Sequence, residues 1–529
     1  MSRIYFETKG RLVLFLGLAL GLFVWFMNSP AGLLAIGCDP FGYARQARLF
    51  RKLGLFSGLD TKVVDPDSHF LIGVAKGLNP NSESWREAIA PHCHHYLDAV
   101  DAVILQYPPG TGFVLSLFPE KISLECVLIF GMALVSACFV WAVASGGRGA
   151  LGSLLGLTSL TLILNSMTQG ELIGSASIPV SIALIPLGVF LGIRAFPSAS
   201  DPRPFLAFLV GIIFGLLFAT RLPNLLLLPG LVLALAVNCR KLPWQPMAAA
   251  SAATAVGFAV AGALPVLASD WINTSNPFST TYSKFDATPP RFDFALVTDH
   301  FFYYFSKSSA APVSITAAAF IIWRLVIFYF ENRGARQFGL WMGATLTFGL
   351  SIVFFCSHEL TAAYYMLPAS VFVLCCVTFE WTGDVASGWS RPGRLAALAL
   401  SVLPLLISAE MLRHALHRSK PQYTIPGDAL AAKSIVWANI SAGTIFYYQH
   451  KYAGKLVFAP PCTQESLVRK VSELGRDQYF IQDSEPMRAV IERLSKSLEL
   501  QEAGEFQTYD TLPILKLPAG SAWHGASCE

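Results

Sequence analysis

The stretch that decides the fold runs from the apolar segment Leu12–Met27 to the polar segment Cys38-Asp39-Pro40-Phe41-Gly42-Tyr43. The apolar segment predicts a membrane span. No convincing cleavage site follows it, so we expect a retained anchor rather than a signal peptide. Asp39 comes soon after this span and opens a long polar loop. A carboxylate held at the membrane interface is a good candidate for a catalytic base.

The composition of the whole chain agrees with a membrane protein. Of its 529 residues, 54% are hydrophobic and 14% are charged, whereas soluble domains carry roughly 25% charged residues. Runs of spanning length are found at 12–28, 122–144, 150–166, 176–195, 204–220, 222–238, 246–268, 313–330, 338–356, 361–379 and 394–409. We therefore predict a polytopic α-helical membrane protein with about eleven transmembrane helices.

The basic residues of the short loops predict the orientation. Lys and Arg gather in alternate loops, which the positive-inside rule assigns to the cytoplasm. The loops 29–121 and 269–312 and the tail then face outward. The net charge of +4 is spread over these loops, so we expect contact with membrane lipids and no nucleic-acid partner.

The tail differs in composition from the rest of the chain. We expect strands at Ser434–Ala438, Lys455–Ala459, Gln478–Ile481 and Leu512–Leu517, and helices at Gln464–Leu474 and Glu485–Ser497. Alternating short strands and helices are typical of a small α/β domain. We predict a transmembrane domain over 1–410 and an extracytoplasmic α/β domain over 411–529.

Two groups in the first loop raise the question of a disulfide bond or a metal ion. A bridge between Cys38 and Cys93 would join the two ends of the loop in an oxidising compartment. His92, Cys93, His94 and His95 resemble a metal site, but adjacent side chains diverge and metal ligands usually follow helical or turn spacing. A solvated loop is the favoured interpretation of this cluster.

The segment after Asp39 has helical spacing. Asp39 suits an N-cap and Pro40 the first helical position. Tyr43 would then share the side of Asp39, whereas Arg45 and Arg48 would lie on another side. Such a helix fits a headgroup boundary, and its arginines could hold a phosphate. The alternative is that Asp39 only caps the helix and the arginines only touch anionic lipid.

Two further motifs contain candidate site residues. Tyr107-Pro108-Pro109-Gly110 closes the first loop, and a re-entry turn alone would explain it. Arg221 lies between two apolar runs on the outward side. An arginine at membrane depth costs a few kcal/mol without a partner, so a ligand phosphate is the favoured explanation over a snorkelling side chain.

The later outward segments are rich in aromatic residues. Loop 273–286 and the run Phe301-Phe302-Tyr303-Tyr304 fit an interfacial aromatic belt. His358 and Tyr364 lie at the outer entrance of a helix. Helix capping with belt tyrosines explains them as well as a binding site does.

Taken in order, these motifs resemble the GT-C superfamily of membrane glycosyltransferases, in particular bacterial protein O-mannosyltransferases and lipid A aminoarabinose transferases. The resemblance is carried by Asp39 with Tyr43, the Tyr107-Pro108-Pro109-Gly110 turn, Thr220-Arg221-Leu222-Pro223, Asn276-Pro277-Phe278 and the tail element Gly443-Thr444-Ile445-Phe446-Tyr447-Tyr448. Each motif is short, and their order along nearly the whole chain makes the case.

The resemblance implies transfer of a sugar from a polyprenyl-phosphate carrier to a glycan, lipid or protein acceptor at the outer face of a bacterial inner membrane. Asp39 would be the general base of an inverting reaction, and Arg221 with Arg45 would bind the donor phosphate. Tyr43, Tyr107, Pro108, Pro109, His358 and Tyr364 would line the cavity.

The chain departs from the family pattern at two places. Many relatives have two acidic residues together after the first span, whereas Asp39 is followed by Pro40, and Gln106 stands where some have a basic residue. These departures leave a divalent metal open as a cofactor. The alternatives are a lipid-linked glycan flippase or transporter, which would not need a fixed carboxylate, and a non-catalytic scaffold whose tail binds a cell-wall partner.

Overall fold

The computed structural model describes residues 38–63, 66–78, 84–91, 93–120, 123–145, 150–167, 175–197, 201–239, 243–281, 292–331, 338–359, 361–381, 434–439, 453–507 and 511–524. The chain divides into two compact units. The helical unit comprises Met1–Ser29, Pro108–Leu267 and Thr288–Arg418. The mixed unit comprises Pro30–Tyr107, Ala268–Ala287 and Ser419–Glu529. The tail thus groups with the first loop, and the predicted domain boundary at residue 410 stays a prediction.

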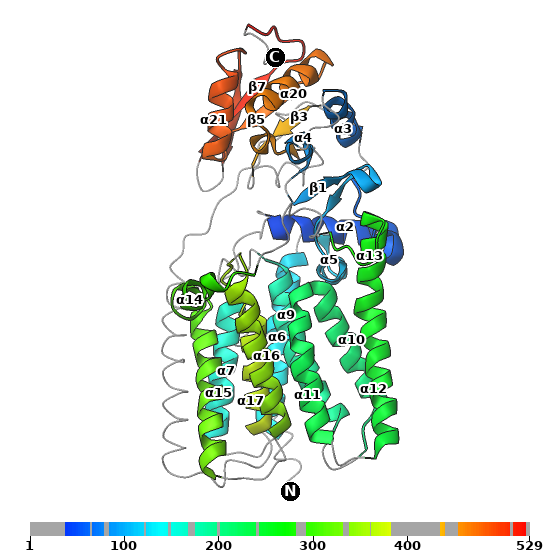
Figure 1. The fold of residues 1–529 in the computed structure, drawn as a ribbon, viewed down its shortest axis with the longest axis vertical. Coiled ribbons are helices and arrows are strands. Elements are labelled where there is room, and N and C mark those ends of the chain that lie inside the picture. The colour runs from blue at the N-terminus through cyan, green and yellow to red at the C-terminus, as the bar shows by residue number, and fades with distance from the viewer. Residues whose placement is uncertain are drawn as a thin grey trace. The chain divides into compact units, whose positions relative to one another are not determined.

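Helices standing side by side form the helical unit (Figure 1). They are α5 (Pro109–Ser116), α6 (Ser123–Ser145), α7 (Ala150–Met167), α9 (Ser177–Ala195), α10 (Pro204–Thr220), η3 (Leu222–Leu226), α11 (Leu227–Cys239), α12 (Trp244–Phe258), η4 (Ala259–Ala263), η6 (Phe294–Leu296), α14 (Val297–Phe302), η7 (Tyr303–Lys307), α15 (Ala311–Glu331), α16 (Phe338–Ser357) and α17 (Leu367–Trp381). Helix α13 (Leu264–Thr274) continues α12 and η4 into the mixed unit.

These helices confirm a polytopic helical membrane protein. Among the described residues, three helices are long and apolar enough to cross a membrane, namely Ser177–Ala195, Trp244–Thr274 and Gly339–Ser357. A fourth would be the bent pair Phe294–Lys307 with Ala311–Val326. Shorter apolar helices lie at other predicted positions, among them Pro204–Thr220. The predicted spans at 12–28 and 394–409 lie outside the described residues, so the total of eleven stays a prediction.

Glycines bring two helices of this unit into backbone contact. A Cβ atom at Gly211 of α10 would lie 2.0 Å from the carbonyl oxygen of Thr254 on α12, and one at Gly257 would lie 2.3 Å from the oxygen of Phe208. Small residues permit such close approach between membrane helices, where packing rather than hydrophobic burial drives association. The α10–α12 pair therefore depends on the absence of side chains at these positions.

In the mixed unit, α2 (Cys38–Ser57) has the predicted two-sided character. Tyr43, Ala47 and Phe50 are buried, whereas Arg45 and Arg48 are half-buried. Gly54 interrupts the helix with a φ of 81°, a conformation that favours glycine. Beyond this break Phe56 is 81% exposed, which fits an apolar helix end at a headgroup boundary.

The rest of the first loop forms α3 (Pro66–Leu78), α4 (Ser84–Ile89), β1 (His94–Leu97), η1 (Asp98–Val100) and β2 (Ala102–Leu105). Strands β1 and β2 make an antiparallel hairpin. His94 is fully buried in β1 and Cys93 is disulfide-bonded, so the predicted solvated loop at this cluster is wrong. His94 belongs to a strand of the hairpin, and successive side chains of a strand point to opposite faces. A side chain on the buried face is therefore shielded from solvent.

The tail folds as a five-stranded mixed sheet with two helices. Its elements are β3 (Ile435–Trp437), β4 (Ala453–Gly454), η9 (Leu456–Phe458), α20 (Pro461–Glu473), β5 (Gln478–Ile481), α21 (Glu485–Leu494), β6 (Gln501–Gln507) and β7 (Thr511–Leu517). The strand order is β4-β3-β5-β7-β6, in which β4, β3 and β5 are parallel. The strand predicted at Lys455–Ala459 is wrong, because most of that segment forms the 3-10 turn η9.

The first loop and the tail share one hydrophobic core. Trp85 and Ile89 of the loop pack in the same buried cluster as Trp437 and Phe480 of the tail. Gly454 lies so close to α4 that a Cβ atom there would be 2.8 Å from the Ala88 carbonyl oxygen. The apolar faces of α3 and α4 are therefore covered by residues more than 300 positions further along the chain.

Candidate active site

Asp39 lies in the first turn of α2, where its carboxylate accepts a hydrogen bond. The Tyr107 hydroxyl donates to Asp39 Oδ1 at 2.6 Å. The Tyr107 ring lies 4.6 Å from the ring of Tyr43, and both tyrosines are buried, whereas Asp39 is half-buried. Three residues predicted for the site thus meet in the mixed unit.

A glycine permits this approach. Any Cβ atom at Gly42 would lie 2.4 Å from the Tyr107 ring. Since a contact that short forces the ring away, Gly42 allows Tyr107 to lie against α2 and reach Asp39. The Gly42 position was not among the predicted site residues, although it stands inside the quoted motif.

Gln106 fixes the backbone that carries Tyr107. Its N–H donates to the Cys93 carbonyl at 3.3 Å, and its carbonyl accepts from the Thr281 hydroxyl at 2.7 Å. Its side-chain oxygen lies 2.8 Å from Nε2 of His95. Two segments of the mixed unit, one at the start of β1 and one at Thr281, therefore hold Gln106. No sequence signal pointed to His95 or Thr281 as supports.

In the helical unit, the turn after Tyr107 packs on the end of α10. A Cβ atom at Gly110 would lie 2.5 Å from the backbone of Ala219, and the Thr111 hydroxyl donates to the Thr220 carbonyl at 3.3 Å. Pro108 is extended, with a ψ of 155°, and Pro109 begins α5. The Pro-Pro-Gly turn therefore holds the helix end from which Arg221 extends.

Arg221 ends α10 with extended backbone, at a φ of −151°. Asn224 holds this break, because its side chain donates to the carbonyl of Leu217 at 2.8 Å and to the hydroxyl of Ser181 at 2.9 Å. Arg221 is half-buried. The bond network places its guanidinium where α10 stops and the chain turns into η3.

The Arg221 guanidinium lies over two tyrosine rings. It is 5.2 Å from the ring centroid of Tyr364 and 5.3 Å from that of Tyr365. Within the described part of the chain, it makes no ion pair with a carboxylate. Ring faces attract a cation without neutralising it, so the guanidinium keeps its donors for an anionic ligand.

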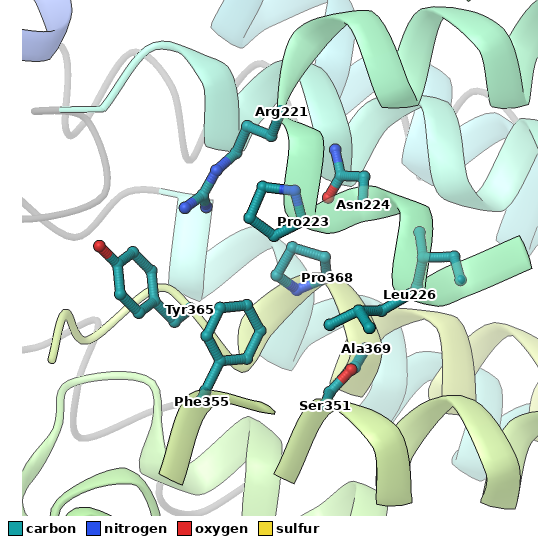
Figure 2. A pocket seen from close by; sticks show the side chains of 10 residues that line it. Arg221, Pro223, Asn224, Leu226, Ser351, Phe355, Tyr365, Pro368 and Ala369 are labelled. Atoms are coloured by element: carbon teal, nitrogen blue, oxygen red, sulfur yellow. The ribbon is translucent and has the colours of Figure 1, made fainter. Parts of the chain in front are cut away.

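A pocket opens beside Arg221 (Figure 2). The pocket is small, and part of it is open to solvent. Arg221 and Tyr365 lie on one side of it, and Leu226, Ser351 and Ala369 on the other. A charged side and an apolar side suit a ligand with an anionic group joined to hydrocarbon.

His358, also predicted for the site, belongs to a row of rings that we call the aromatic wall: Phe292, Phe354, His358 and Tyr365. His358 stacks on Phe354 at 5.7 Å, and its ring centroid is 6.4 Å from that of Tyr365. Phe292 meets Phe354 edge-on at 5.4 Å. The wall therefore continues from the tyrosines below Arg221 to His358 and Phe292.

Solved structures with this arrangement of elements are known. A crystal structure of ArnT from Cupriavidus metallidurans in the apo state matches 96% of this chain and 98% of its own, with a TM-score of 0.55 and 12% sequence identity. The chain has the ArnT fold. A crystal structure of the same protein bound to undecaprenyl phosphate covers 97% of this chain and 99% of its own, with a TM-score of 0.43 and 13% identity. No protein-family model and no curated protein sequence matches the chain.

The ArnT fold agrees with the membrane-protein architecture that the motifs predict. It also confirms an integral membrane protein. At 12% identity the likeness concerns the fold alone, so the activity has to be argued from the residues.

Two further predictions concern Arg45 and a metal ion. Arg45 lies half-buried on α2 in the mixed unit, and Arg221 lies in the helical unit. Among the described residues, no three His, Cys, Asp or Glu side chains gather closely enough to hold a metal ion.

Proposed function

We propose that the protein is a glycosyltransferase that moves a sugar from a polyprenyl-phosphate carrier to an acceptor hydroxyl at the outer face of the membrane. The observation that carries this proposal is the Arg221 guanidinium, which lies on two tyrosine rings beside a half-apolar pocket. Arginine binds phosphate oxygens with two parallel donors. A lipid-linked phosphate has an anionic group for the arginine and hydrocarbon for the apolar side of the pocket.

Asp39 supplies the base in this proposal. As the acceptor oxygen bonds to the anomeric carbon, its proton passes to the Asp39 carboxylate. The bond between the anomeric carbon and the phosphate oxygen breaks, and the electron pair leaves with the lipid phosphate. Arg221, assisted by Arg45, stabilises the charge of that phosphate. A single displacement of this kind inverts the anomeric centre.

The cavity-lining roles follow from the same contacts. Tyr107 and Tyr43 orient Asp39, and Pro108 with Pro109 shapes the turn that supports the Arg221 helix end. Tyr364 supports the guanidinium from below. A divalent metal is not required by this scheme.

The disulfide bonds of the mixed unit support its place outside the cytoplasm. Cys93 and Cys462 are both disulfide-bonded, and such bonds persist in oxidising compartments such as the periplasm. We infer that the mixed unit and the predicted tail domain 411–529 are extracytoplasmic and that the protein lies in a bacterial inner membrane. The acceptor, whether glycan, lipid or protein, then meets the enzyme on that side.

The test is glycosyl transfer by the purified protein. The assay offers radiolabelled polyprenyl-phosphate sugars together with a membrane-lipid and glycan extract as acceptor. We expect Asp39→Asn to lower turnover by about 10²–10⁴-fold while donor binding is kept. Asp60→Asn is the matched control, because Asp60 lies in the same loop and pairs with Lys62 at an exposed position.

Two results would contradict the assignment. Equal transfer by the parent and Asp39→Asn would place the base elsewhere, with Asp65 and Asp67 of the same loop as the further candidates. A parent that binds lipid-linked sugars but never transfers them would favour the flippase.

A further inference from the structure

We propose that the aromatic wall binds the sugar ring of the lipid-linked donor by stacking, while Arg221 binds its phosphate. This inference rests on the proposed function and adds a second part to the same site. It assigns Phe292 and His358 to recognition of a pyranose ring, a class of ligand that a phosphate pocket alone would not distinguish.

One end of the aromatic wall lies next to the Arg221 guanidinium. The ring of the wall next to Arg221 is Tyr365, whose centroid lies 5.3 Å from the guanidinium. The next ring is His358, whose centroid is 6.4 Å from that of Tyr365. Phe354 stacks on His358, and Phe292 lies 6.3 Å from His358. A phosphate held at Arg221 would therefore have a row of ring faces and edges running away from it, in the direction that a glycosidic substituent can follow.

Separate segments build the wall. Phe354 and His358 come from the end of α16, and Tyr365 comes from the turn before α17. Phe292 belongs to a third segment, which is held by a backbone bridge to His358 and by the Asp293 N–H donating to the Ser357 carbonyl at 2.8 Å. Three segments that converge on one row of rings suggest a recognition surface rather than scattered interfacial aromatics.

The chemistry of the wall suits a sugar. Aromatic faces carry negative charge density and ring edges carry positive, so the C–H groups of a pyranose pack favourably on the faces. Phe292 is 55% exposed, and Phe354 and His358 are half-buried, so the row keeps accessible surface.

Two binding probes separate the sugar from the phosphate. The first is undecaprenyl phosphate, and the second is undecaprenyl phosphate carrying glucose, galactose or mannose. Dissociation constants are measured for the full-length protein in nanodiscs, together with Phe292→Ala, His358→Ala and Arg221→Gln. The matched control is Phe294→Ala, because Phe294 is 76% exposed, lies two positions from Phe292 and is not part of the wall.

We expect Phe292→Ala and His358→Ala to weaken binding of the sugar-linked probes about three- to tenfold and to leave undecaprenyl phosphate unchanged. Arg221→Gln should weaken both probes, and Phe294→Ala neither. Unchanged thermal unfolding of the two wall variants would show that they keep the fold.

Three outcomes would overturn the inference. Equal weakening of both probes would mean that the wall contacts the isoprenoid or supports the pocket. No weakening of either would make it an interfacial aromatic belt. A parent that binds undecaprenyl phosphate, with no gain from any attached sugar, would remove the sugar subsite but keep the phosphate site. Binding of neither probe by the parent would instead remove the proposed function itself, and the subsite with it.

Discussion

Asp39 owes its orientation to Tyr107, which lies 68 positions away in the sequence. The phenol donates to one carboxylate oxygen, so that oxygen is occupied and the carboxyl group is prevented from rotating freely. The Tyr107 backbone is in turn held through Gln106 by Cys93, His95 and Thr281. The placement of the proposed base thus depends on the end of a β-hairpin.

Replacing Tyr107 by Phe should change the orientation of Asp39 without changing the binding of the donor. The ring contact with Tyr43 remains, but the hydrogen bond to Asp39 is lost. Because a hydrogen bond to a charged group contributes roughly 1.5–3 kcal/mol, we expect kcat to fall at least about tenfold while KM for the donor stays constant. Steady-state kinetics at saturating acceptor measures both values.

Tyr96→Phe is the control for that substitution. Tyr96 donates a hydrogen bond of the same length, 2.6 Å, to Asp101 in the same unit but away from the site. Loss of this hydrogen bond should lower the free energy of unfolding of the protein and leave kcat unchanged. A similar fall in kcat for both variants would show that Tyr107 acts through folding alone.

Helix α10 carries Arg221 at its end, so its packing on α12 bears on the site. In Gly211→Ala the new methyl group would meet the Thr254 carbonyl oxygen, and the helices would have to separate. Overpacking of this kind costs about 1–3 kcal/mol. We expect a lower Tm in detergent and weaker binding of undecaprenyl phosphate.

Gly349→Ala in α16 is the matched substitution, because a Cβ atom there meets nothing within 4 Å. Alanine has the higher helix propensity, by about 1 kcal/mol, so this variant should unfold at the same or a higher temperature. An equal fall in Tm for Gly211→Ala and Gly349→Ala would contradict the close packing of α10 on α12 as the cause.

The tail sheet depends on an ion pair next to β5. Burial raises the pKa of Asp477, but bonds from the Lys516 ammonium at 2.9 Å and the Ala519 N–H at 2.9 Å outweigh it, so the pKa is lowered overall. The folded state therefore favours the ionised carboxylate. Its contribution to stability is present above the unfolded pKa of about 3.9 and is lost as the pH falls through the lower, folded-state pKa.

Asp477→Asn should accordingly destabilise the tail by about 1 kcal/mol at pH 7, since the pair is partly exposed. The difference from the parent should shrink below pH ~4. Hydrogen exchange of peptides covering β5 and β7, corrected for intrinsic rates at each pH, measures it. A difference that stays constant down to pH ~2 would show that charge plays no part.

In the mixed unit as a whole, two cysteines that are distant in the sequence, Cys93 and Cys462, are each disulfide-bonded. Cys93 follows α4, and Cys462 begins α20, and both helices contribute to the shared core or its border. We expect these two disulfide-bonded cysteines to be bonded to each other. A protease digest without reductant should release a linked peptide pair, and reduction should destabilise the unit by roughly 2–4 kcal/mol.

The competing arrangement is the bridge between Cys38 and Cys93 that the sequence suggested. A linked peptide containing Cys38 would contradict the pairing with Cys462. Cys375 and Cys376, which form no disulfide bond and are buried in α17, serve as internal controls that react with alkylating reagents only after unfolding.

Much of the fold could be predicted because it depends on local pattern. The run 204–220 is the helix Pro204–Thr220, and the strand predicted at Gln478–Ile481 is β5. Strand β6 was missed, because Gln501–Gln507 contains two glutamates and a glycine and becomes a strand only by pairing with β7. Asp39 and Arg221 stood out by charge and position, whereas Thr281, His95 and Gly42 take their roles from distant partners that a linear pattern does not contain.

The shared core of the first loop and the tail also constrains how the protein is made. Trp85 and Ile89 leave the ribosome several hundred residues before Trp437 and Phe480, with which they pack. At about 5–20 residues per second, the interval is roughly twenty to seventy seconds. During biogenesis the nascent loop therefore has an uncovered apolar face until the tail has been translated. We expect truncated products to be recognised by quality-control proteases through that face.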